Sequence, residues 1–377
     1  MKKVLSGIFV VFALTVVFPC CAYAVPDNSA ASMILIHADT GQVLYQKNAD
    51  AQKLIASTTK IMTALVVLDN CSPDEEVKIL PAYTKVEGSS VYLKVGESYT
   101  VCDLLYGMLL SSGNDAATAL AYHCGGSIEG FAKMMNDKAR EMGLCNSSFK
   151  NPHGLDEEGH YSSAADLATI TCEAMKNKLF EKIVSTKTYT VCNQTYLNHN
   201  KLLWNYDGCL GVKTGYTIAA GRSLVSCAER NGLKLICVTL SDPNDWEDHK
   251  ALFDWAFDNY EYKSVLPMGA ICELPVISGE RETVGITASS NIRILVKKNV
   301  KIDFSLELPK FVYAGVKEGD CAGRVFITAD NAQVGEFPLL YSENVDIADN
   351  VKLSAWGRFK RAWFMANKYG FLFQGSD

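Results

Sequence analysis

The chain has 377 residues, of which 48% are hydrophobic and 21% charged, and 36 Lys and Arg against 42 Asp and Glu give a formal net charge of −6. This ordinary globular composition excludes disordered, collagen-like and coiled-coil architectures. An acidic chain is a poor candidate for sequence-independent binding to nucleic acid, so we expect no nucleic-acid partner. The length predicts two or three domains.

The first 24 residues have the pattern of a secretory signal peptide. Two lysines precede an apolar stretch over residues 4–17, and an Ala-Tyr-Ala sequence ends at Ala24, which is the pattern that signal peptidase recognises. We therefore expect residues 1–24 to be removed on export. An acylated lipoprotein is a weaker alternative, because the bulky Phe18-Pro19 precedes the candidate lipid-bearing Cys20 and Cys21, and an uncleaved anchor is a further alternative.

Hydrophobic patterning predicts an α+β unit after the leader. Apolar runs at 33–36 and 43–45 flank an Asp-Thr-Gly turn and indicate a hairpin. The later predicted elements, in chain order, are helices over 57–68, 102–110 and 164–175, strands over 210–214, 223–228 and 233–240, and a helix over 246–259. Helices that flank a largely antiparallel sheet favour an α+β domain over a doubly wound one.

The pattern changes after about residue 268. Short alternating strands are predicted over 292–296, 301–306, 323–328 and 334–339, separated by Gly and Asp-Asn turn signals. This pattern indicates a small all-β domain. The predicted organisation is a signal peptide over 1–24, an α+β catalytic domain over 25–265, an all-β domain over 266–348 and a C-terminal amphipathic helix over 349–377.

Thirteen cysteines are present, and eleven of them follow the predicted leader. No CxxC pair occurs, so zinc ribbons and thioredoxin-like redox motifs have no support. We expect most of the thiols to be small buried apolar side chains.

Ser57-Thr58-Thr59-Lys60 stands at the start of the long predicted helix. The spacing of three residues places Ser57 and Lys60 on one helical face, within reach of each other. A serine hydroxyl becomes a strong nucleophile when a base takes its proton, and a desolvated lysine with a lowered pKa is such a base. Alone, the motif is equally typical of a capping serine beside a solvated lysine.

Two further motifs follow at long spacing. Ser112-Gly113-Asn114 offers a hydroxyl that relays protons and an amide that holds a carbonyl or the lysine, although the same residues are good turn material. Lys213-Thr214-Gly215 lies in a predicted strand, where lysine and threonine suit a carboxylate and glycine permits close approach of a substrate backbone. Each motif is weak alone, and the ordered triplet is specific.

The triplet resembles the SxxK, SxN and KTG motifs of penicillin-binding proteins and class A β-lactamases. The surrounding residues are similar to the secreted D-alanyl-D-alanine carboxypeptidases, the low-molecular-mass penicillin-binding proteins. The segments that carry this resemblance are 56–64, 112–117, 151–155, 161–164 and 211–217. The resemblance implies a penicillin-binding-protein/β-lactamase-like transpeptidase fold, followed by the all-β domain and the terminal helix.

The resemblance also implies a site and a reaction. Ser57 would attack the carbonyl before the terminal D-alanine of a peptidoglycan stem pentapeptide, with Lys60 as general base and Ser112 as the proton relay. The implied substrate-binding residues are Asn114, Lys213, Thr214, Gly215 and Tyr216. Backbone N–H groups of Ser57 and Tyr216 would form the oxyanion hole. β-Lactams would acylate and inhibit the enzyme, and neither a metal nor a cofactor is expected.

One departure from the family concerns an arginine that some relatives use near the closing helix to grip the substrate carboxylate. The corresponding segment here, 242–249, contains no arginine. Arg222 is the nearest later arginine along the chain after the KTG motif, but the sequence does not give its direction on the strand.

Two alternative functions stay open at this point. A class A-like β-lactamase shares the triplet, but it needs a deacylating base, usually in a Glu-x-x-Leu-Asn stretch that this sequence lacks. A catalytically decayed peptidoglycan-binding surface protein is disfavoured because the reactive residues are intact.

The C-terminal segment is basic and aromatic. Between residues 354 and 373 the sequence holds four basic residues and no acidic one: Arg358, Lys360, Arg361 and Lys368. At about 100° per residue, Trp356, Phe359 and Trp363 share one side of a helix and most of the cations take the other. We therefore expect peripheral anchoring to anionic lipid on the outer face of the cytoplasmic membrane. Docking on the protein's own β domain is the alternative.

Overall fold

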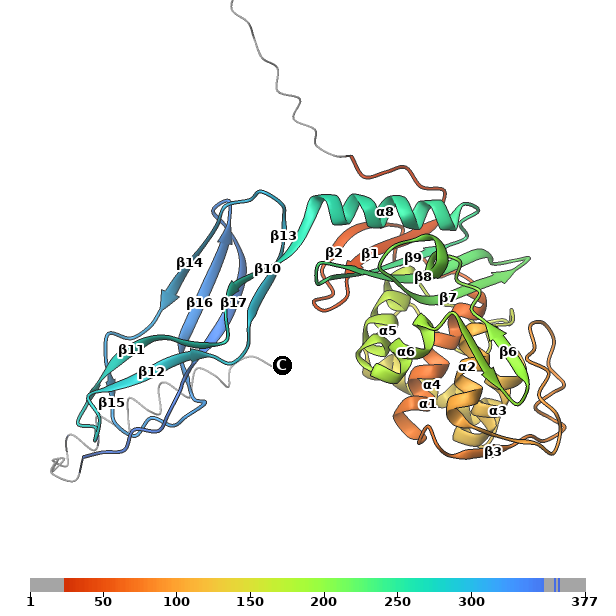
Figure 1. The fold of residues 1–377 in the computed structure, drawn as a ribbon, viewed down its shortest axis with the longest axis horizontal. Coiled ribbons are helices and arrows are strands. Elements are labelled where there is room, and N and C mark those ends of the chain that lie inside the picture. The colour runs from red at the N-terminus through yellow and green to blue at the C-terminus, as the bar shows by residue number, and fades with distance from the viewer. Residues whose placement is uncertain (1–23, 349–355, 357–358, 360–377) are drawn as a thin grey trace, which may run out of the picture.

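The computed structural model describes residues 24–348 together with Trp356 and Phe359. Two units are joined where the long helix α8 (Asp245–Asn259) runs into strand β10 (Tyr260–Leu266) (Figure 1). The predicted signal peptide up to residue 23, and the predicted terminal helix apart from the two aromatic residues, lie outside the described residues. Within the described part, no helix is long and apolar enough to cross a membrane.

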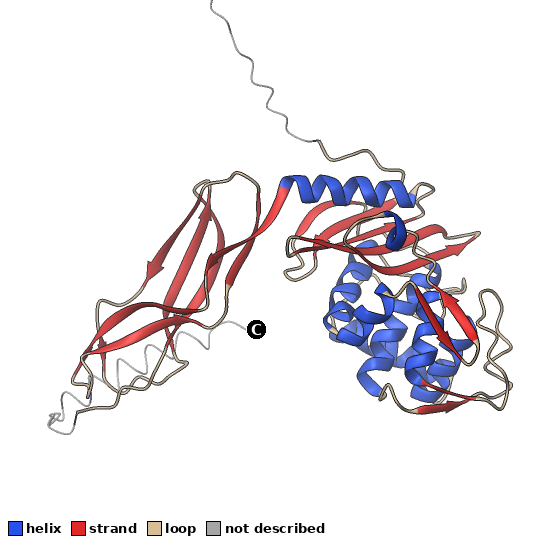
Figure 2. Ribbon diagram, viewed as in Figure 1, coloured by secondary structure: helices blue, strands red, loops and turns tan. Residues whose placement is uncertain are grey.

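The first unit is built on a five-stranded antiparallel sheet with the order β2-β1-β9-β8-β7. The strands are β1 (Ser32–His37), β2 (Val43–Lys47), β7 (Cys209–Thr217), β8 (Gly221–Arg230) and β9 (Leu233–Leu240). α8 covers one face and a cluster of helices covers the other (Figure 2). Because strand side chains alternate between faces, Met33 and Leu35 pack with α8, whereas Ile34 and Ile36 join the larger core under the helices.

The helices of the cluster come from the part of the chain between residues 56 and 205. Its helices are α1 (Lys60–Asn70), α2 (Val101–Leu110), α3 (Asn114–Gly125), α4 (Ile128–Glu141), α5 (Ala164–Lys176), α6 (Lys178–Ser185) and the short α7 (Leu202–Asn205). Two small hairpins flank them: β3 (Glu76–Lys78) with β4 (Ser98–Thr100), and β5 (Thr188–Val191) with β6 (Gln194–Leu197). Capping side chains define several helix starts, such as Thr100 with Asp103 at α2 and Ser163 at α5.

The predicted elements of this unit are confirmed, with one local difference. The turn between β8 and β9 has Asn231 and Gly232 at its centre, and their φ values of 52° and 74° are those that a type I′ hairpin requires. The long helix begins at Lys60, whereas Ser57 lies in a 3-10 turn over Ala56–Thr59. Ala56 has a φ of 46°, a left-handed conformation that breaks the regular helix just before Ser57.

The second unit is all-β, as the alternating pattern predicted. Its six-stranded sheet has the order β14-β16-β17-β12-β11-β15, and β10 pairs separately with β13. The strands are β11 (Gly269–Ile277), β12 (Thr283–Ala288), β13 (Ile292–Lys297), β14 (Ile302–Glu307), β15 (Val312–Tyr313), β16 (Cys321–Ala329) and β17 (Ala332–Tyr341). Aliphatic side chains such as Val284, Ile286 and Ile327 form its core.

Candidate active site

The serine and the lysine of the first motif are in contact. Lys60 Nζ donates hydrogen bonds to Ser57 Oγ at 2.9 Å, to Asn114 Oδ1 at 2.7 Å and to the His153 carbonyl oxygen at 2.7 Å. The Lys60 side chain is fully buried at the first position of α1. The 3-10 turn before it therefore presents Ser57 to a lysine whose three contacts fix its position.

Burial favours the neutral form of this lysine, which is the form that can act as a base. Removal from water lowers the pKa of Lys60 well below its ordinary value, and the positive charge of Lys213 lowers it further, while Asp115 acts in the opposite direction. A lowered pKa increases the fraction of the neutral amine, which is the form that accepts a proton from the serine.

The loop over 151–155 supports the serine and the lysine from below. Gly154 has a φ of 87°, and a Cβ there would lie 1.9 Å from the Ala56 carbonyl oxygen, so only glycine permits this approach. The neighbouring Pro152 carbonyl oxygen accepts a hydrogen bond from Thr63 at 2.6 Å. Burial and then the charge of Lys60 lower the pKa of His153 to about 3, so its ring is neutral. Separately, the backbone carbonyl oxygen of His153 accepts the hydrogen bond from Lys60.

The second motif joins the site at the start of α3. Ser112 has a φ of 61°, an uncommon conformation for a residue with a side chain, and such conformations gather at functional sites. Asn114 Nδ2 donates to the Glu87 carbonyl oxygen at 2.6 Å while its Oδ1 accepts from Lys60. The amide therefore connects the lysine to the loop that follows β3.

Asp115 holds that loop in place. Its carboxylate accepts hydrogen bonds from Ser90 Oγ at 2.7 Å and from the backbone N–H groups of Val91 and Leu93 at 3.0 and 3.1 Å. The loop brings Ser89 to the pocket that contains Ser57 and Ser112. The sequence analysis did not identify this segment, because its contribution depends on a carboxylate more than twenty residues away.

The third motif lies on β7, the edge strand beside the 3-10 turn. Lys213 is buried, its Nζ donates to the Thr214 carbonyl oxygen at 2.9 Å, and burial lowers its pKa to about 7. A Cβ on Gly215 would lie 3.0 Å from the Ile55 carbonyl oxygen and 3.1 Å from the Ser57 backbone nitrogen. The glycine thus allows the strand to approach the serine closely.

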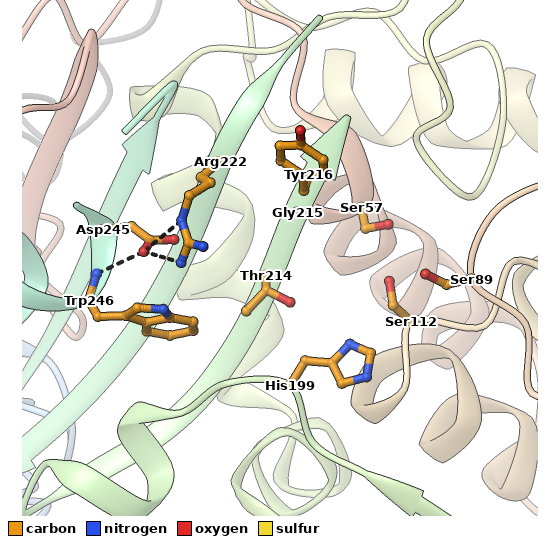
Figure 3. Close-up of a pocket in the computed structure, with 10 residues that line it drawn as sticks. All are labelled: Ser57, Ser89, Ser112, His199, Thr214, Gly215, Tyr216, Arg222, Asp245 and Trp246. Atoms are coloured by element: carbon orange, nitrogen blue, oxygen red, sulfur yellow. Dashed lines mark hydrogen bonds and ion pairs between the residues drawn. The ribbon is translucent and has the colours of Figure 1, made fainter. Parts of the chain in front are cut away.

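A pocket of about 420 Å³ opens between β7 and the two serine-bearing segments. Its lining residues are Ser57, Ser89, Ser112, His199, Thr214, Gly215, Tyr216, Arg222, Asp245 and Trp246. In Figure 3 the three serines lie together across from Thr214, and Arg222 extends from β8 toward the opposite end. The structure thus brings the three sequence motifs together, and it adds contributors that the sequence analysis did not identify.

Arg222 and its neighbours form the end of the pocket away from the serines. Arg222 Nε donates to Asp245 Oδ1 at 3.1 Å, a second guanidinium nitrogen also contacts that oxygen, and the guanidinium lies 5.6 Å from the Trp246 ring centroid. Burial and then the charge of Lys213 lower the pKa of the His199 imidazole, which follows the β5–β6 hairpin. Neither His199 nor Trp246 belongs to one of the three motifs, so the sequence analysis did not identify them as pocket residues.

The fold and the three converging motifs define a serine peptidase of the penicillin-binding class. Residues 21–244 match the sequence profile of the D-alanyl-D-alanine carboxypeptidase family, and residues 260–346 match that of the C-terminal domain of penicillin-binding protein 5. The chain belongs to this family of D-alanyl-D-alanine carboxypeptidases, whose members work through a serine acyl-enzyme.

Individual relatives cover most of the chain. It is 32% identical to the D-alanyl-D-alanine carboxypeptidase DacF of Bacillus subtilis, over 96% of this chain and 100% of that protein. It is 31% identical to DacC of Escherichia coli, over 90% and 88%. Penicillin binding protein 5 of Haemophilus influenzae has a similar structure, with a TM-score of 0.75 and 30% identity over 85% of this chain and 98% of that one.

Proposed function

We propose that Ser57, Lys60 and Ser112 carry out the carboxypeptidase reaction on the terminal D-alanine of peptidoglycan stem pentapeptides. The observation that carries the proposal is the 2.9 Å contact between Ser57 Oγ and the Nζ of a fully buried lysine. Because burial lowers the pKa of that lysine, the serine has a base at the distance that proton transfer requires.

The reaction has two chemical steps. Ser57 Oγ attacks the carbonyl carbon between the two terminal D-alanines, and Lys60 takes the hydroxyl proton. The C–N bond then breaks, and a proton passes through Ser112 to the amine of the departing D-alanine. Water hydrolyses the resulting ester and returns the proton to Ser57. A β-lactam acylates the same oxygen, but its cleaved ring stays attached and blocks the site.

The remaining site residues bind the substrate. The N–H groups of Ser57 and Tyr216 stabilise the oxyanion, and Gly215 lets the substrate backbone approach β7. Lys213 and Thr214 hold the terminal carboxylate, and Lys213 supplies positive potential from beneath the strand. Asn114 orients Lys60 through its Oδ1, and its amide group contacts the acyl chain of the substrate.

Arg222 supplies the carboxylate contact that the segment over 242–249 lacks. It pairs with Tyr216 across β7 and β8, and its guanidinium lines the pocket that holds Ser57. Asp245 and Trp246 orient it, since the carboxylate accepts from two of its nitrogens and the indole lies beside its planar face. This position at the end of the pocket suits a bound carboxylate.

The sequence supports export and peripheral attachment to the outer face of the cytoplasmic membrane. The basic, aromatic pattern of residues 354–373 suits the interface of an anionic membrane, and the described Trp356 and Phe359 are exposed with their rings stacked at 5.5 Å. Deletion of residues 354–377 should release an active enzyme from anionic vesicles, and salt should weaken the binding of the full chain. Undiminished sedimentation of the truncated enzyme with vesicles would contradict this proposal.

A labelling time course tests the proposed reaction. The full chain is incubated with fluorescent penicillin and, separately, with a peptide that ends in two D-alanines. We expect a covalent adduct that decays slowly, together with release of free D-alanine. Rapid loss of the adduct with turnover of the drug would instead indicate a β-lactamase, and the absence of both adduct and D-alanine would indicate a decayed site.

A further inference from the structure

Helices α1 and α3 both begin at the active site, and their opposite ends converge on a second cluster of reactive side chains. α1 starts with Lys60 and is followed by Cys71 at its C-cap, and α3 starts with Asn114 and carries His123 in its last turn. At 1.5 Å per residue these helices carry the chain roughly 16 Å away from the site. The C-terminal ends of α1 and α3, which lie away from the active site, are therefore close to each other.

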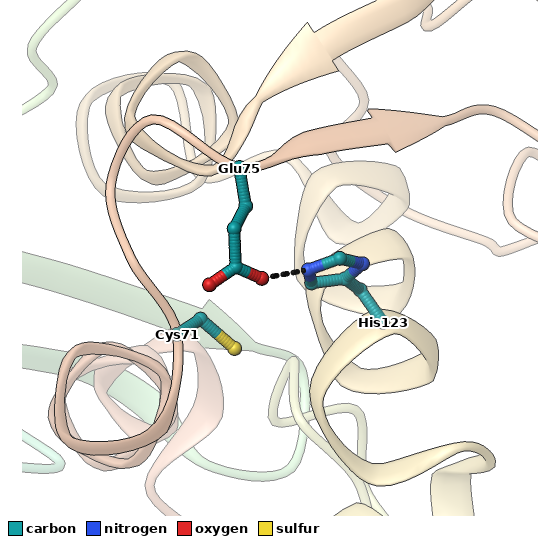
Figure 4. A group of neighbouring side chains, drawn as sticks. All are labelled: Cys71, Glu75 and His123. Atoms are coloured by element: carbon teal, nitrogen blue, oxygen red, sulfur yellow. Dashed lines mark hydrogen bonds and ion pairs between the residues drawn. The ribbon is translucent and has the colours of Figure 1, made fainter.

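Three potential ligand atoms meet there. The Cys71 Sγ, a Glu75 carboxylate oxygen and a His123 ring nitrogen all lie within 4.8 Å of one another. The side chains point toward a common centre from α1, from the loop after it and from α3 (Figure 4). His123 Nε2 is 2.8 Å from Glu75 Oε2.

The backbone around the cluster is well fixed. Cys71 N–H donates to the Val67 carbonyl oxygen at 2.8 Å, and Ser72 N–H donates to Glu75 Oε1 at 2.5 Å. Because Ser72 holds one carboxylate oxygen, the other is directed toward His123. The Glu75 carbonyl oxygen accepts from Val101 N–H at 2.9 Å, which fastens the loop to the start of α2.

Cys124 adds a neighbour to the cluster. It follows His123 on α3, and its thiol is close enough to the Cys71 thiol for each to influence the pKa of the other. Groups that hydrogen-bond to a metal ligand commonly orient it and tune its affinity. The arrangement therefore provides three candidate ligands and one supporting partner.

We propose that Cys71, Glu75 and His123 bind one divalent cation of the zinc class. A thiolate, an imidazole and a carboxylate together suit a borderline-soft ion such as Zn²⁺, whereas Mg²⁺ and Ca²⁺ prefer oxygen ligands alone. Bonds of about 2.0–2.3 Å in a tetrahedral site separate the ligand atoms by about 3.3–3.8 Å. The side chains of Glu75 and His123 are 44% and 25% exposed, so rotation of their ends can part these two atoms, which are 2.8 Å apart, and admit the ion, with water as the fourth ligand.

The bound cation would connect the ends of α1 and α3 that lie away from the catalytic residues. A ligand that binds the folded protein stabilises it in proportion to the logarithm of its concentration over Kd, so the cation would stabilise the helical cluster that holds Lys60 and Asn114 in place. The site does not depend on the catalytic assignment. No short motif marks it, because its ligands are brought together from positions 71, 75 and 123.

Cobalt absorption and titration calorimetry test the site on the reduced full chain. We expect one Co²⁺ per chain with a thiolate-to-cobalt charge-transfer band, and competition by Zn²⁺ at higher affinity. At a hundredfold excess of Zn²⁺ over Kd, Tm should rise by about 5 °C. Cys71→Ser should remove the band, and His123→Ala should weaken binding about a hundredfold. Cys124→Ala, which removes only the supporting partner, should weaken it about tenfold.

Cys145→Ser is the matched control, because Cys145 is an exposed free thiol outside the cluster. Penicillin labelling of each variant verifies that it is folded. Equal Co²⁺ or Zn²⁺ affinity in wild type and a labelled Cys71→Ser variant would overturn the proposal. So would a Cys71–Cys124 disulfide found by mass spectrometry in protein that was alkylated as its cells were opened.

Discussion

The two domains differ in what they bury. In the peptidase domain many polar and charged side chains are buried, among them Lys60, Lys213, Asp115 and Asp166, whereas the buried side chains described after His249 are apolar except for Tyr341. Burial of such groups is costly unless they are hydrogen-bonded. At the site, hydrogen bonds offset this cost, as those of Lys60 to Ser57, Asn114 and the His153 carbonyl oxygen do, whereas the β domain depends on an almost wholly apolar core.

This comparison separates two kinds of substitution. A change in the buried polar groups that hold Ser57 and Lys60 should alter chemistry more than folding, because those groups position the nucleophile and its neighbouring amine. A change in the apolar core of the β domain should alter folding and leave the chemistry intact. The predictions below run from the largest expected effect to the smallest.

Ser57→Ala should abolish both penicillin acylation and release of D-alanine, because it removes the oxygen that forms the acyl bond. Fluorescent penicillin labelling and a D-alanine assay measure the two activities. Ser185→Ala on α6, whose hydroxyl contacts only backbone carbonyls of its own helix, should retain both. A penicilloyl adduct on the Ser57→Ala variant would refute the assignment of the nucleophile.

Lys60→Arg should lower the acylation rate by about 10²–10⁴-fold, since a guanidinium keeps its charge and cannot accept the serine proton. Stopped-flow acylation measures the rate, and Lys133→Arg at an exposed ion pair on α4 is the control. A Lys60→Arg enzyme that keeps most of its acylation rate would exclude the general-base role.

The two buried lysines should also give the wild-type enzyme a bell-shaped pH profile of kcat/KM. Acylation needs neutral Lys60, so the rate should fall as pH drops through its lowered pKa. Carboxylate binding needs protonated Lys213, whose pKa is lowered to about 7, so kcat/KM should also fall as pH rises above about 7. An alkaline limb that is unchanged in Lys213→Arg would contradict the second assignment.

Arg222→Gln should raise KM for a D-alanine-terminated peptide about tenfold with a smaller change in kcat. A charge-assisted hydrogen bond contributes about 1.5–3 kcal/mol, and the 40% exposure of this side chain favours the lower end. Arg230→Gln is the matched control, because Arg230 pairs with Asp254 outside the pocket. Equal KM values for both variants would argue against Arg222 as the carboxylate contact.

Ile327→Ala should lower the free energy of unfolding of the β domain by about 3 kcal/mol, because it leaves a cavity at a fully buried position on β16. Denaturant unfolding measures the stability, and acylation below the transition should be unchanged. Val334→Ala, at an exposed position on β17, should change stability by less than about 0.5 kcal/mol. A large loss of acylation in folded Ile327→Ala would show that the two domains are not separable in this way.

Mild alkylation of the thiols should have the smallest effect on catalysis. No cysteine lies within the three motifs, and burial raises the pKa of Cys209, four residues before Lys213, to about 11. Iodoacetamide treatment of the native protein, followed by penicillin labelling, should show most activity retained. Stoichiometric loss of activity on modification of a single thiol would identify a cysteine near the pocket.

Much of this protein is readable from local sequence. The strands at 33–36, 223–228 and 233–240, the all-β second domain and the three motifs that meet at the pocket all follow from patterns a few residues long. The physical reasons are local too. Alternation of apolar and polar residues predicts the buried face of a strand, and a spacing of three residues places a serine and a lysine on the same side of a helical turn. The helices α3, α4 and α6 were not predicted, although α4 and α6 carry clear amphipathic patterns in their own sequence.

The tertiary structure decided what surrounds the motifs. Only packing shows that Lys60 is fully buried and bonded to Asn114 and to the His153 carbonyl, and this burial lowers its pKa. Arg222 and Asp245 meet across 23 positions of sequence, and Cys71 meets His123 across 52, so no spacing rule anticipates either contact. Desolvation and convergence of side chains depend on the whole fold, whereas a motif carries only the identity and order of its residues.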